Sequence, residues 1–588
     1  MEFQSQNKNL PVSIFTFATM KFCARFFLCW LFIFSNSAFE KIIAQSALVP
    51  LGTETYRLLD RLEIKSGIHL TDIHTSVKPY RRDNIIKSIH QFDTIYPTVR
   101  FTYIDGKNME YFDNDNSEWI DSDTINSDNP IYYFYRTKAD LYSAKSEDFM
   151  IRINPVLQFG IGADTFQSDL GRFVNTRGVE ARGWIAQKVG YYIYIGENQA
   201  RYTNYVQNYT NKVGGVPGNG YYKNFKGTGV DYLTTRGYVD FTTAKFINVN
   251  FGRDKNFFGN GYRSLQLSDF SEDYLFLRLK TKVWRLEYTN LFADLTSDFI
   301  RGGDRLLPKK YAAFHHLSLN ATSFLNIGLF EGVVFRRADV FEFQYLVPLI
   351  FYRGVEQGLG SPDNAFIGAD VKINFLRAFS VYSQVMIDDM NITALRAGTG
   401  YWANKLGSQL GIKYVDAFTV ENLDLQLEGN WVRPYTYTHY DSVSNYTHYN
   451  QPLAHPLGAN FSEWIVIARY QPAKNFWMTA KWFDIWMGQD SLKGISPNIT
   501  STNFGGNIQQ MATEPTVKAI YGNKIGQGVS THLTIGSLTL TYMLKHNLFI
   551  DAGLTYRAAY SNVHRYDEGV IYWYASVRLN IPAKLFEF

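Results

Sequence analysis

The chain has 588 residues, is rich in Tyr, Phe and Gly (41, 45 and 44 copies), and carries a formal net charge of +4 at pH 7. So small a net charge does not indicate a nucleic acid or a strongly acidic partner. Beyond the first 44 residues no apolar run approaches the ~20 residues that a membrane-spanning helix needs. A mature chain that crosses a membrane must therefore do so as a closed β-barrel, since helices and closed barrels alone satisfy every backbone polar group in lipid.

Residues 1–44 have the pattern of a secretory signal peptide. Lys21 and Arg25 precede an apolar run at residues 26–34, which has the length of a signal-peptide core and is too short for a membrane span. We expect cleavage after Ala44. Both cysteines of the chain would be removed with this segment, namely Cys23 and Cys29, and the mature protein would hold no thiol and no disulfide.

The next segment, residues 45–130, carries helical patterns. Thr53 followed by Glu54 offers an N-cap and a first-turn acid, and Tyr56, Leu59 and Leu62 recur at helical spacing. These apolar residues either pack within their own domain or present a face on which another protein docks.

A second candidate helix opens at Pro79 and carries Ile85, Ile86 and Ile89. The acidic stretch at residues 113–129 follows and predicts a loop or linker. We therefore expect a small, largely helical periplasmic domain over residues 45–130, beneath the barrel or partly inside it.

Residues 131–588 predict an outer-membrane antiparallel β-barrel, because segments of about ten residues alternate between apolar and polar positions. About 18 strands are expected, an even number as single-chain bacterial barrels require. They lie at residues 147–160, 172–186, 189–200, 237–244, 247–253, 273–283, 284–295, 311–320, 325–336, 364–375, 379–388, 404–415, 422–431, 462–470, 474–487, 530–542, 547–558 and from 571 to the end.

Residue parity within the strands separates a lipid face from a lumen face. Between Leu275 and Val283 every second residue is Leu, Thr or Val, and the interleaved residues include Arg278, Lys280 and Lys282. A charge facing lipid at the membrane midplane costs ~2–4 kcal/mol, so the charged set must point inward. Several aromatic residues fall on the outward parity and suit interfacial girdles: Tyr470, Phe476, Trp482 and Trp486.

Connection lengths segregate by end. The connections assigned to the periplasm are tight, such as residues 187–188 and 376–377, whereas the long ones, at residues 201–229, 337–363, 432–461 and 488–529, all fall on the outer side. At the end of the chain, the alternation that begins at Ile571 leads to Phe588, and a terminal aromatic on such a strand is the usual mark of an outer-membrane barrel. We expect the last strand to run to Phe588.

One loop, residues 251–269, reads F-G-R-D-K-N-F-F-G-N-G-Y-R-S-L-Q-L-S-D. Its glycines Gly252, Gly259 and Gly261 permit tight bends, and its basic residues concentrate charge. Two interpretations stay open: a loop that contributes to ligand binding, or a plug that fills the lumen and pairs charges. The candidate ligand-binding residues here are Arg253, Lys255, Phe258 and Arg263, with Gly252, Gly259, Gly261 and Ser264 as the backbone of the motif.

This segment resembles the G-R-x-x-x-x-F/W-x-G-x-G-x-x-S-L-x-L-S stretch of the capsule-assembly family Wzi, and more closely its Bacteroidetes branch, which includes the gliding-motility protein RemB. Residues 49–52, 59–63 and 76–82 are similar to that branch as well, so the resemblance covers essentially the mature chain. A departure is Phe258, where other members carry Trp, and the long loops at 432 and 488 show no pattern that aligns.

The resemblance implies an 18-stranded barrel of the Gram-negative outer membrane, with a periplasmic helical bundle, that acts as a surface lectin and retains exported polysaccharide. Two alternatives remain: a RemB-like component of gliding, adhesion or secretion machinery, with protein partners on residues 45–130, and a diffusion channel. No cofactor is expected.

The long outer loops are rich in tyrosine, whose planar ring and hydroxyl suit contact with sugars. Tyr221 and Tyr222 in one loop and Tyr435 and Tyr437 in another are the candidates. The histidines of the second loop have no fixed ligand spacing, so we expect solvated side chains and no metal site: His439, His448 and His455.

No pattern of an enzyme is present. The sequence has no G-x-S-x-G or H-E-x-x-H motif. Asp388 and Asp389 are adjacent at a strand end, but neighbouring carboxylates on a strand point to opposite faces and would not share a substrate. We expect a non-enzymatic barrel.

The topology can be tested by labelling. A cysteine introduced at Ser442, in a predicted outer loop, should react with a membrane-impermeant thiol reagent on intact cells, whereas a cysteine at Gln187, in a predicted periplasmic turn, should not. Equal labelling at the two positions would contradict the topology.

Overall fold

The structure is a computed structural model that describes residues 45–95, 98–120, 125–128, 130–166, 171–297, 306–337, 340–490, 502–563 and 567–588, which belong to one compact unit. The predicted signal peptide, with Cys23, Cys29 and the cleavage site at Ala44, lies outside the described residues. Among the helices that the structure describes, none is long and apolar enough to cross a membrane.

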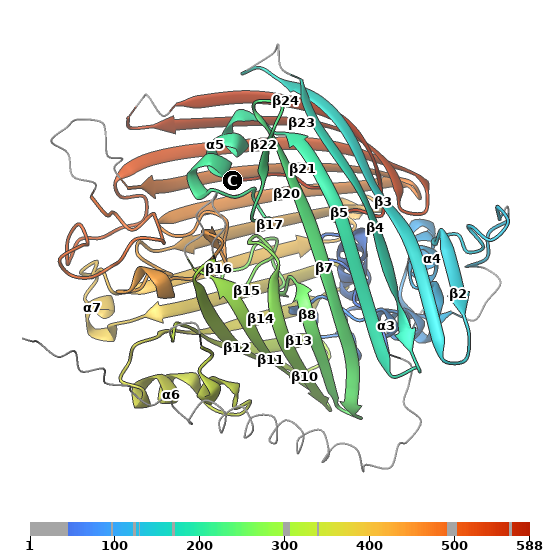
Figure 1. The fold of residues 1–588 in the computed structure, drawn as a ribbon, viewed down its shortest axis with the longest axis horizontal. Helices are drawn as coiled ribbons and strands as arrows, with labels where there is room; N and C mark the ends of the chain where they lie inside the picture. Colours follow the sequence, from blue (N-terminus) through green and yellow to red (C-terminus); the bar gives the residue numbers. More distant parts are fainter. Residues whose placement is uncertain are drawn as a thin grey trace, which may run out of the picture. The chain divides into compact units, whose positions relative to one another are not determined.

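Over the described residues, eighteen long antiparallel strands pair in order and close into a barrel, because β24 pairs with β3 and β8 pairs with β10 (Figure 1). They are β3 (Phe149–Asp164), β4 (Arg172–Ile185), β5 (Val189–Arg201), β7 (Gly229–Ala244), β8 (Ile247–Asp254), β10 (Tyr274–Val283), β11 (Leu286–Thr296), β12 (Lys309–Asn320), β13 (Leu325–Phe335), β14 (Asn364–Phe375), β15 (Phe379–Asp389), β16 (Lys405–Tyr414), β17 (Leu423–Val432), β20 (Phe461–Ala473), β21 (Phe476–Gln489), β22 (Val529–Lys545), β23 (Leu548–Ser561) and β24 (Glu568–Leu579). Two short strands pair antiparallel with the ends of longer ones: β2 (Tyr142–Lys145) with β3, and β6 (Lys223–Phe225) with β7. Every predicted strand overlaps an observed one, and the predicted fold class is confirmed.

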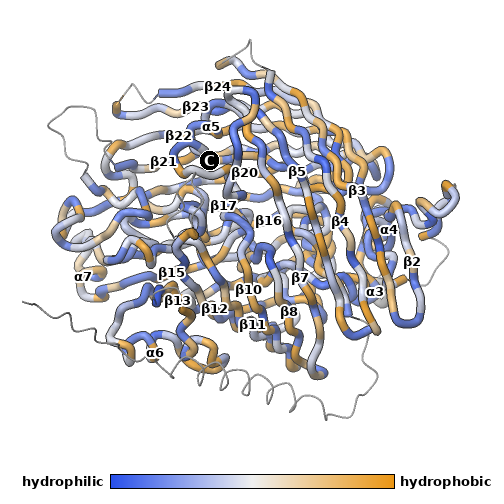
Figure 2. Tube along the Cα trace, in the orientation of Figure 1, coloured by the Kyte–Doolittle hydropathy of each residue, from blue (hydrophilic) through white to orange (hydrophobic). Residues whose placement is uncertain are grey.

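The predicted inward and outward faces are also observed. On the outward parity, Leu275, Val283, Trp482 and Trp486 are 41–50% exposed, whereas Arg278 on the inward parity is 1% exposed. Apolar and polar residues alternate along the strands (Figure 2). An exposed apolar belt on a closed sheet is the surface that an outer-membrane barrel presents to lipid.

Short and long connections lie at opposite ends. The turn between β4 and β5 is made by Ala186 and Gln187 with φ near +51° and +54°, and Leu376 and Arg377 repeat this conformation between β14 and β15. The long loops at the other end hold the helices α5 (Asn204–Val213), α6 (Tyr352–Gly358) and α7 (Ile392–Arg396). Figure 1 shows α6 and α7 at one end and the N-terminal helices, in blue, toward the other.

The N-terminal segment is helical, as expected. Helix α2 (Glu54–Ser66) begins after Thr53, and α3 (Arg82–Ile95) begins three residues after Pro79. Leu59 and Leu62 are buried in a core formed within this segment, so they are covered by their own domain.

A third helix corrects the expectation of a loop from residue 113. Helix α4 (Tyr103–Asp115) continues through that position and is followed by a 3-10 turn, η2 (Ser117–Trp119). The reason is a capping box at its start, in which Thr102 and Asp105 satisfy each other's backbone N–H groups. Phe112 is fully buried in the helical core and fixes the last turn.

Ion pairs attach these helices to the barrel wall. Arg61 of α2 contacts Asp105 of α4 at 2.8 Å, Asp416 at 2.6 Å, and Asp424 of β17. Lys372 of β14 lies between Asp60 at 2.8 Å and Glu63 of the same helix. Buried ion pairs therefore attach the helical segment to the inner side of the wall, and we call the described residues between 45 and 119 the plug.

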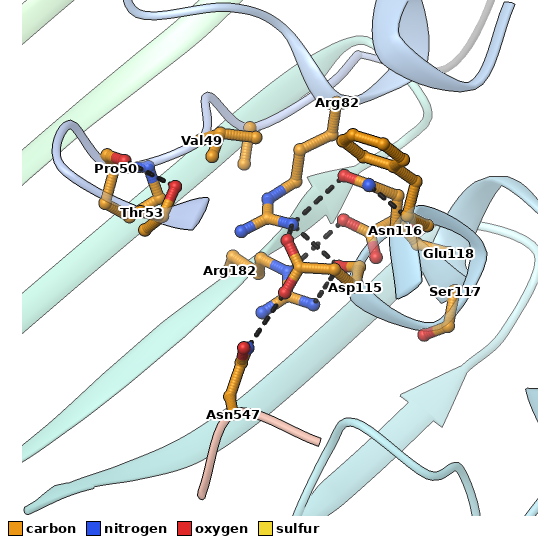
Figure 3. A network of polar contacts seen from close by, with 12 residues as sticks. Val49, Pro50, Thr53, Arg82, Asp115, Asn116, Ser117, Glu118, Arg182 and Asn547 are labelled. Carbon is orange, nitrogen blue, oxygen red and sulfur yellow. Dashed lines mark hydrogen bonds and ion pairs between the residues drawn. The ribbon is translucent and has the colours of Figure 1, made fainter. Parts of the chain in front are cut away.

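A second network lies around Asp115 (Figure 3). Its carboxylate accepts from Arg82 at 2.9 Å and Asn547 at 3.0 Å, and Arg182 of β4 donates to its carbonyl at 3.2 Å. Burial acts to raise the pKa of Asp115, but Arg82, His546 and Arg182 hold that pKa well below its usual range. The plug is thus linked to two distant parts of the wall.

The prediction that the last strand runs to Phe588 is wrong. Strand β24 ends at Leu579, because Asn580 takes a left-handed φ of 54° and Pro582 lacks the N–H that a strand would donate. The tail at residues 580–588 turns into the lumen, where Phe588 packs against Tyr205 and Tyr209 of α5.

The loop between β13 and β14 covers part of the outward face of the wall. Tyr345 and Tyr352 are fully buried against outward residues of β11–β13, and the Tyr352 ring stacks on His315 at 4.0 Å. His315 in turn contacts Glu331 at 2.7 Å. Two polar residues on the lipid-facing parity are shielded from lipid in this way.

The pairing of plug and wall predicts a stability effect. Arg61→Met would leave three carboxylates around α2 without their guanidinium partner, which should lower the free energy of unfolding by ~3–5 kcal/mol. Urea unfolding of the refolded protein in detergent, followed by tryptophan fluorescence, measures it. Lys107→Met removes a solvent-exposed pair with Glu110 and should change nothing measurable. Equal stability of the two variants would contradict the role of Arg61.

Candidate functional site

The glycine-rich segment between β8 and β10 folds into the lumen and divides it. Its short strand β9 (Phe257–Phe258) pairs with β1 (Val77–Lys78) of the plug, and Phe258 N–H donates to the carbonyl of Leu267 at 2.9 Å. The segment therefore forms a hairpin inside the barrel that is continuous with the plug. We call residues 254–270 the motif loop.

Two of its glycines are required by close approach of the wall. A Cβ on Gly259, whose φ is 140°, would lie 2.6 Å from Nε2 of Gln384, and a Cβ on Gly261 would lie 2.7 Å from Oε2 of Glu428. Gly252 lies in β8, and Ser264 is fully buried with its hydroxyl donating to the carbonyl of Phe258. Gly259, Gly261 and Ser264 therefore shape the loop, whereas Gly252 allows the close approach of β7 to β8.

Glu428 of β17 is a wall residue that binds the backbone of the motif loop, and no sequence pattern predicted this role. Its buried carboxylate accepts from the backbone N–H groups of Tyr262 at 2.6 Å and Arg263 at 3.0 Å, and from the hydroxyl of Tyr382 at 2.7 Å. The signal in the sequence was a lone acid on the inward parity of a strand, which does not reveal its partner 166 residues away.

The predicted basic residues of the motif lie in different surroundings. Arg253 forms a half-exposed pair with Glu272 at 2.9 Å, whereas the Lys255 ammonium donates to the carbonyls of Gly218 and Asp269. Arg263 donates to the carbonyl of Glu587 in the tail. Phe258 is fully buried against wall residues, so its surface is used for packing.

The loop between β17 and β20 forms a roof over the motif loop. The hydroxyl of Tyr437 donates to the carbonyl of Leu265 at 2.7 Å, that of Tyr446 donates to Gln266 at 2.6 Å, and Ser268 N–H donates to Leu453 at 2.8 Å. The roof, the motif loop and the wall share one apolar core.

The tyrosines predicted to bind sugar differ in exposure, because most of them are packed in the interior. Tyr435 and Tyr437 are at most 1% exposed and Tyr222 is 4% exposed, whereas Tyr221 is 53% exposed. The expectation of solvated loop histidines is wrong for His448 and His455, which are 2% and 0% exposed because the roof packs inward.

A different set of aromatic residues faces outward at the loop end. Tyr521 and Tyr440 are 59% and 51% exposed. Tyr401, from the loop that carries α7, has its ring 5.6 Å from that of Tyr521. The two loops are joined by backbone bonds, including Trp402 N–H to the Ile520 carbonyl at 2.9 Å, which fixes the two rings side by side.

Below the roof lies an internal chamber of about 660 Å³. Residues from the plug, the motif loop, the wall and the tail line it, among them eleven Lys or Arg and seven Asp or Glu. Among the described residues, no group of three or more His, Cys, Asp or Glu side chains is placed to hold a metal ion.

No protein-family model and no curated protein matches the sequence. Among solved structures, the fold is similar to Wzi of Escherichia coli, an outer-membrane protein involved in group 1 capsule assembly and described as a carbohydrate-binding β-barrel; the TM-score is 0.55 and the identity 13%, over 92% of this chain and 100% of that chain. OprD of Pseudomonas aeruginosa is similar at a TM-score of 0.40 and 10% identity, over 73% of this chain and 95% of that one. OccAB2 of Acinetobacter baumannii gives 0.41 and 8%, over 73% and 97%.

At these identities the likeness shows the fold alone. The chain has the fold of Gram-negative outer-membrane β-barrels, and the likeness to Wzi spans 92% of the chain. None of these comparisons supports the finer resemblance to RemB.

The role of Glu428 can be tested by Glu428→Gln. The side-chain amide would place N–H groups among donors that all need an acceptor, so the motif loop should lose its anchor. Amide hydrogen exchange at residues 257–268 should accelerate at least tenfold, with that of α2–α4 unchanged. The matched control Glu421→Gln affects an exposed pair with Arg100 and should leave both regions as they are. Unaltered exchange in Glu428→Gln would show that the loop is held by other contacts.

Proposed function

We propose that this protein binds surface polysaccharide through its outer loops and holds it at the cell surface, as a closed barrel rather than a channel. The observation that carries the proposal is that the roof packs into the lumen while two neighbouring outer loops hold the rings of Tyr401 and Tyr521 side by side at the loop end. A barrel built in this way uses its loops as a contact surface.

The exposed face has the chemistry that sugars need. The rings of Tyr401 and Tyr521 offer flat apolar surface for stacking, and their hydroxyls can bond to sugar hydroxyls. Tyr521 directly follows Ile520, whose carbonyl accepts the hydrogen bond from Trp402 of the α7 loop. The two rings are therefore held in place before a ligand binds, which lowers the entropic cost of binding. The likeness to Wzi, itself described as carbohydrate-binding, supports the same function.

Occupation of the lumen argues against the diffusion-channel alternative. The plug, the motif loop, the tail and the roof succeed one another along the barrel and are connected by buried contacts. Opening a path would break the ion pairs of Arg61 and the bonds of Glu428, which belong to the most buried polar contacts described above.

The RemB-like scaffold alternative rested on an accessible amphipathic helix at Tyr56, Leu59 and Leu62. Leu59 and Leu62 are 0% and 1% exposed, and the Tyr56 hydroxyl donates to the carbonyl of Val49. This helix offers no free apolar face, so the scaffold role has less support than polysaccharide binding.

The double variant Tyr401→Ala/Tyr521→Ala tests the proposal. Loss of two stacking rings, each worth ~0.5–1.5 kcal/mol, should weaken binding of the host's purified surface polysaccharide about tenfold or more and reduce the polymer retained on cells. Surface plasmon resonance on the purified barrel and a glycan stain of whole cells measure the two effects.

The matched control is Trp284→Ala/Phe418→Ala, which removes two exposed aromatic residues, 74% and 71% exposed, from short turns at the opposite end. It should bind and retain polysaccharide like the unmodified protein. Unchanged retention in the Tyr401/Tyr521 variant, together with large conductance of the purified protein in a lipid bilayer, would favour the channel instead.

A further inference from the structure

The internal chamber contains positive charge that the protein itself does not neutralise. Most of its cations contact a carboxylate: Arg57 pairs with Glu54 at 3.0 Å, and Lys481 pairs with Glu587 at 2.8 Å. Four lining cations have no carboxylate within 4 Å among the described residues, namely Lys78, Lys255, Arg469 and Lys584. The lining carboxylate without a cation is Asp269, so the unpaired charges in the described part of the chamber are predominantly positive.

The four cations differ in what else they contact. Lys255 donates to two carbonyls, Lys78 donates to the Gly259 carbonyl at 3.2 Å, and Arg469 donates to Oε1 of Gln426 at 3.1 Å. Lys584 of the tail forms no hydrogen bond or ion pair within the described chain, and its ammonium lies 5.5 Å from the ring centre of Tyr232. Neutral acceptors satisfy N–H groups but leave the charge uncompensated.

The position of Lys584 is set by the inward turn of the tail. Gly52 of the plug approaches Pro582 closely, Glu587 contacts Lys481, and Phe588 packs on α5, so the tail is held at both ends of its path. The side chain of Lys584 is accessible to the chamber between these anchors. The fold thus holds the Lys584 ammonium in the chamber with no carboxylate partner among the described residues.

We propose that the chamber is a second binding site, distinct from the outer loops, for a monosaccharide-sized anion that carries a carboxylate or phosphate group. The volume lies in the range of ~300–1,000 Å³ that small-molecule sites occupy, well above the need of a simple ion. Tyr194, Tyr232, Asn198 and Thr234 line the same wall of the chamber, so aromatic rings and polar side chains border the space beside Lys584.

Burial tunes this site toward neutral pH. Lys584 is accessible within the chamber, but the surrounding protein limits its hydration and lowers its pKa to about 7, with the charges of Lys255 and Arg236 acting in the same direction against Glu272 and Asp273. Burial likewise lowers the pKa of Lys78 to about 7, assisted by Lys413 and Lys372 and opposed by Asp60 and Asp269.

Glu272 adds to this effect, since burial and then the charge of Asp273 raise its pKa to about 7, against Lys255 and Arg253. As the pH falls through 7, both lysines gain a proton and Glu272 loses its charge. The two lysines line the chamber, and Glu272 lies outside the lining but close enough for its charge to act on Lys584. An anion should therefore bind more tightly at pH 6 than at pH 8.

Titration calorimetry on the full chain in detergent tests the site with three probes: D-glucuronate, D-glucose 6-phosphate and uncharged D-glucose. At least one charged sugar should bind, more tightly at pH 6 than at pH 8, and glucose should not. Lys584→Gln and Lys78→Gln should each weaken that binding at least tenfold. Lys474→Gln, in the exposed turn between β20 and β21, is the matched control and should bind like the unmodified protein.

Three results would overturn the proposal: no binding of either charged sugar at pH 6, equal binding of glucose, or unchanged binding in the Lys78→Gln/Lys584→Gln double variant. Lys584→Gln removes no hydrogen bond of the described chain, so it should fold, which heat-modifiable migration on a gel verifies. The variant Tyr401→Ala/Tyr521→Ala should retain anion binding, so failure of this site and failure of the outer glycan surface give different results.

Discussion

The interior of this barrel is filled through charge pairing across the boundary between wall and plug. Inward strand positions must be polar or charged because the outward ones face lipid, and those charges need partners once water is excluded. The plug supplies them: Asp60 and Glu63 meet Lys372, and Arg61 meets Asp416 and Asp424. In this barrel of eighteen strands, charge pairs between plug and wall thus fill the interior together with the apolar core that the motif loop shares with the roof.

The same constraint explains the motif loop. It carries backbone N–H groups into the middle of the lumen, where no regular sheet receives them, and Glu428 accepts two of them. Glycine at positions 259 and 261 allows the wall to come this close. The resemblance in this segment therefore reflects a packing requirement first, and its ligand role stays a prediction for the basic residues that reach the chamber.

The two proposed binding sites lie in different parts of the barrel. Tyr437 and Tyr446 of the roof are buried against the motif loop, whereas the half-buried Tyr401 and the exposed Tyr521 lie together on two other outer loops. The chamber is lined by the motif loop, the tail, the plug and the wall. An outer surface for a polymer and an inner site for a small anion are compatible because different residues form them.

Much of the architecture follows from the sequence by itself. The two-residue alternation around Leu275 and Trp482 and the clustering of turn residues are local properties, so strand positions, lipid face and loop asymmetry could be predicted, as could helix α2 from Thr53 and its apolar spacing. The tertiary structure decided what depends on residues far apart in the chain. Phe588 looked like the end of a strand but packs on Tyr209, Tyr435 and Tyr437 looked like ligand contacts but form the roof, and Glu428 and Lys584 acquire their roles from partners that no local pattern records. The alternation of apolar and polar residues determines which face of the strand a side chain occupies. Which distant segment packs against the inner face and pairs its charges is decided only by the tertiary structure.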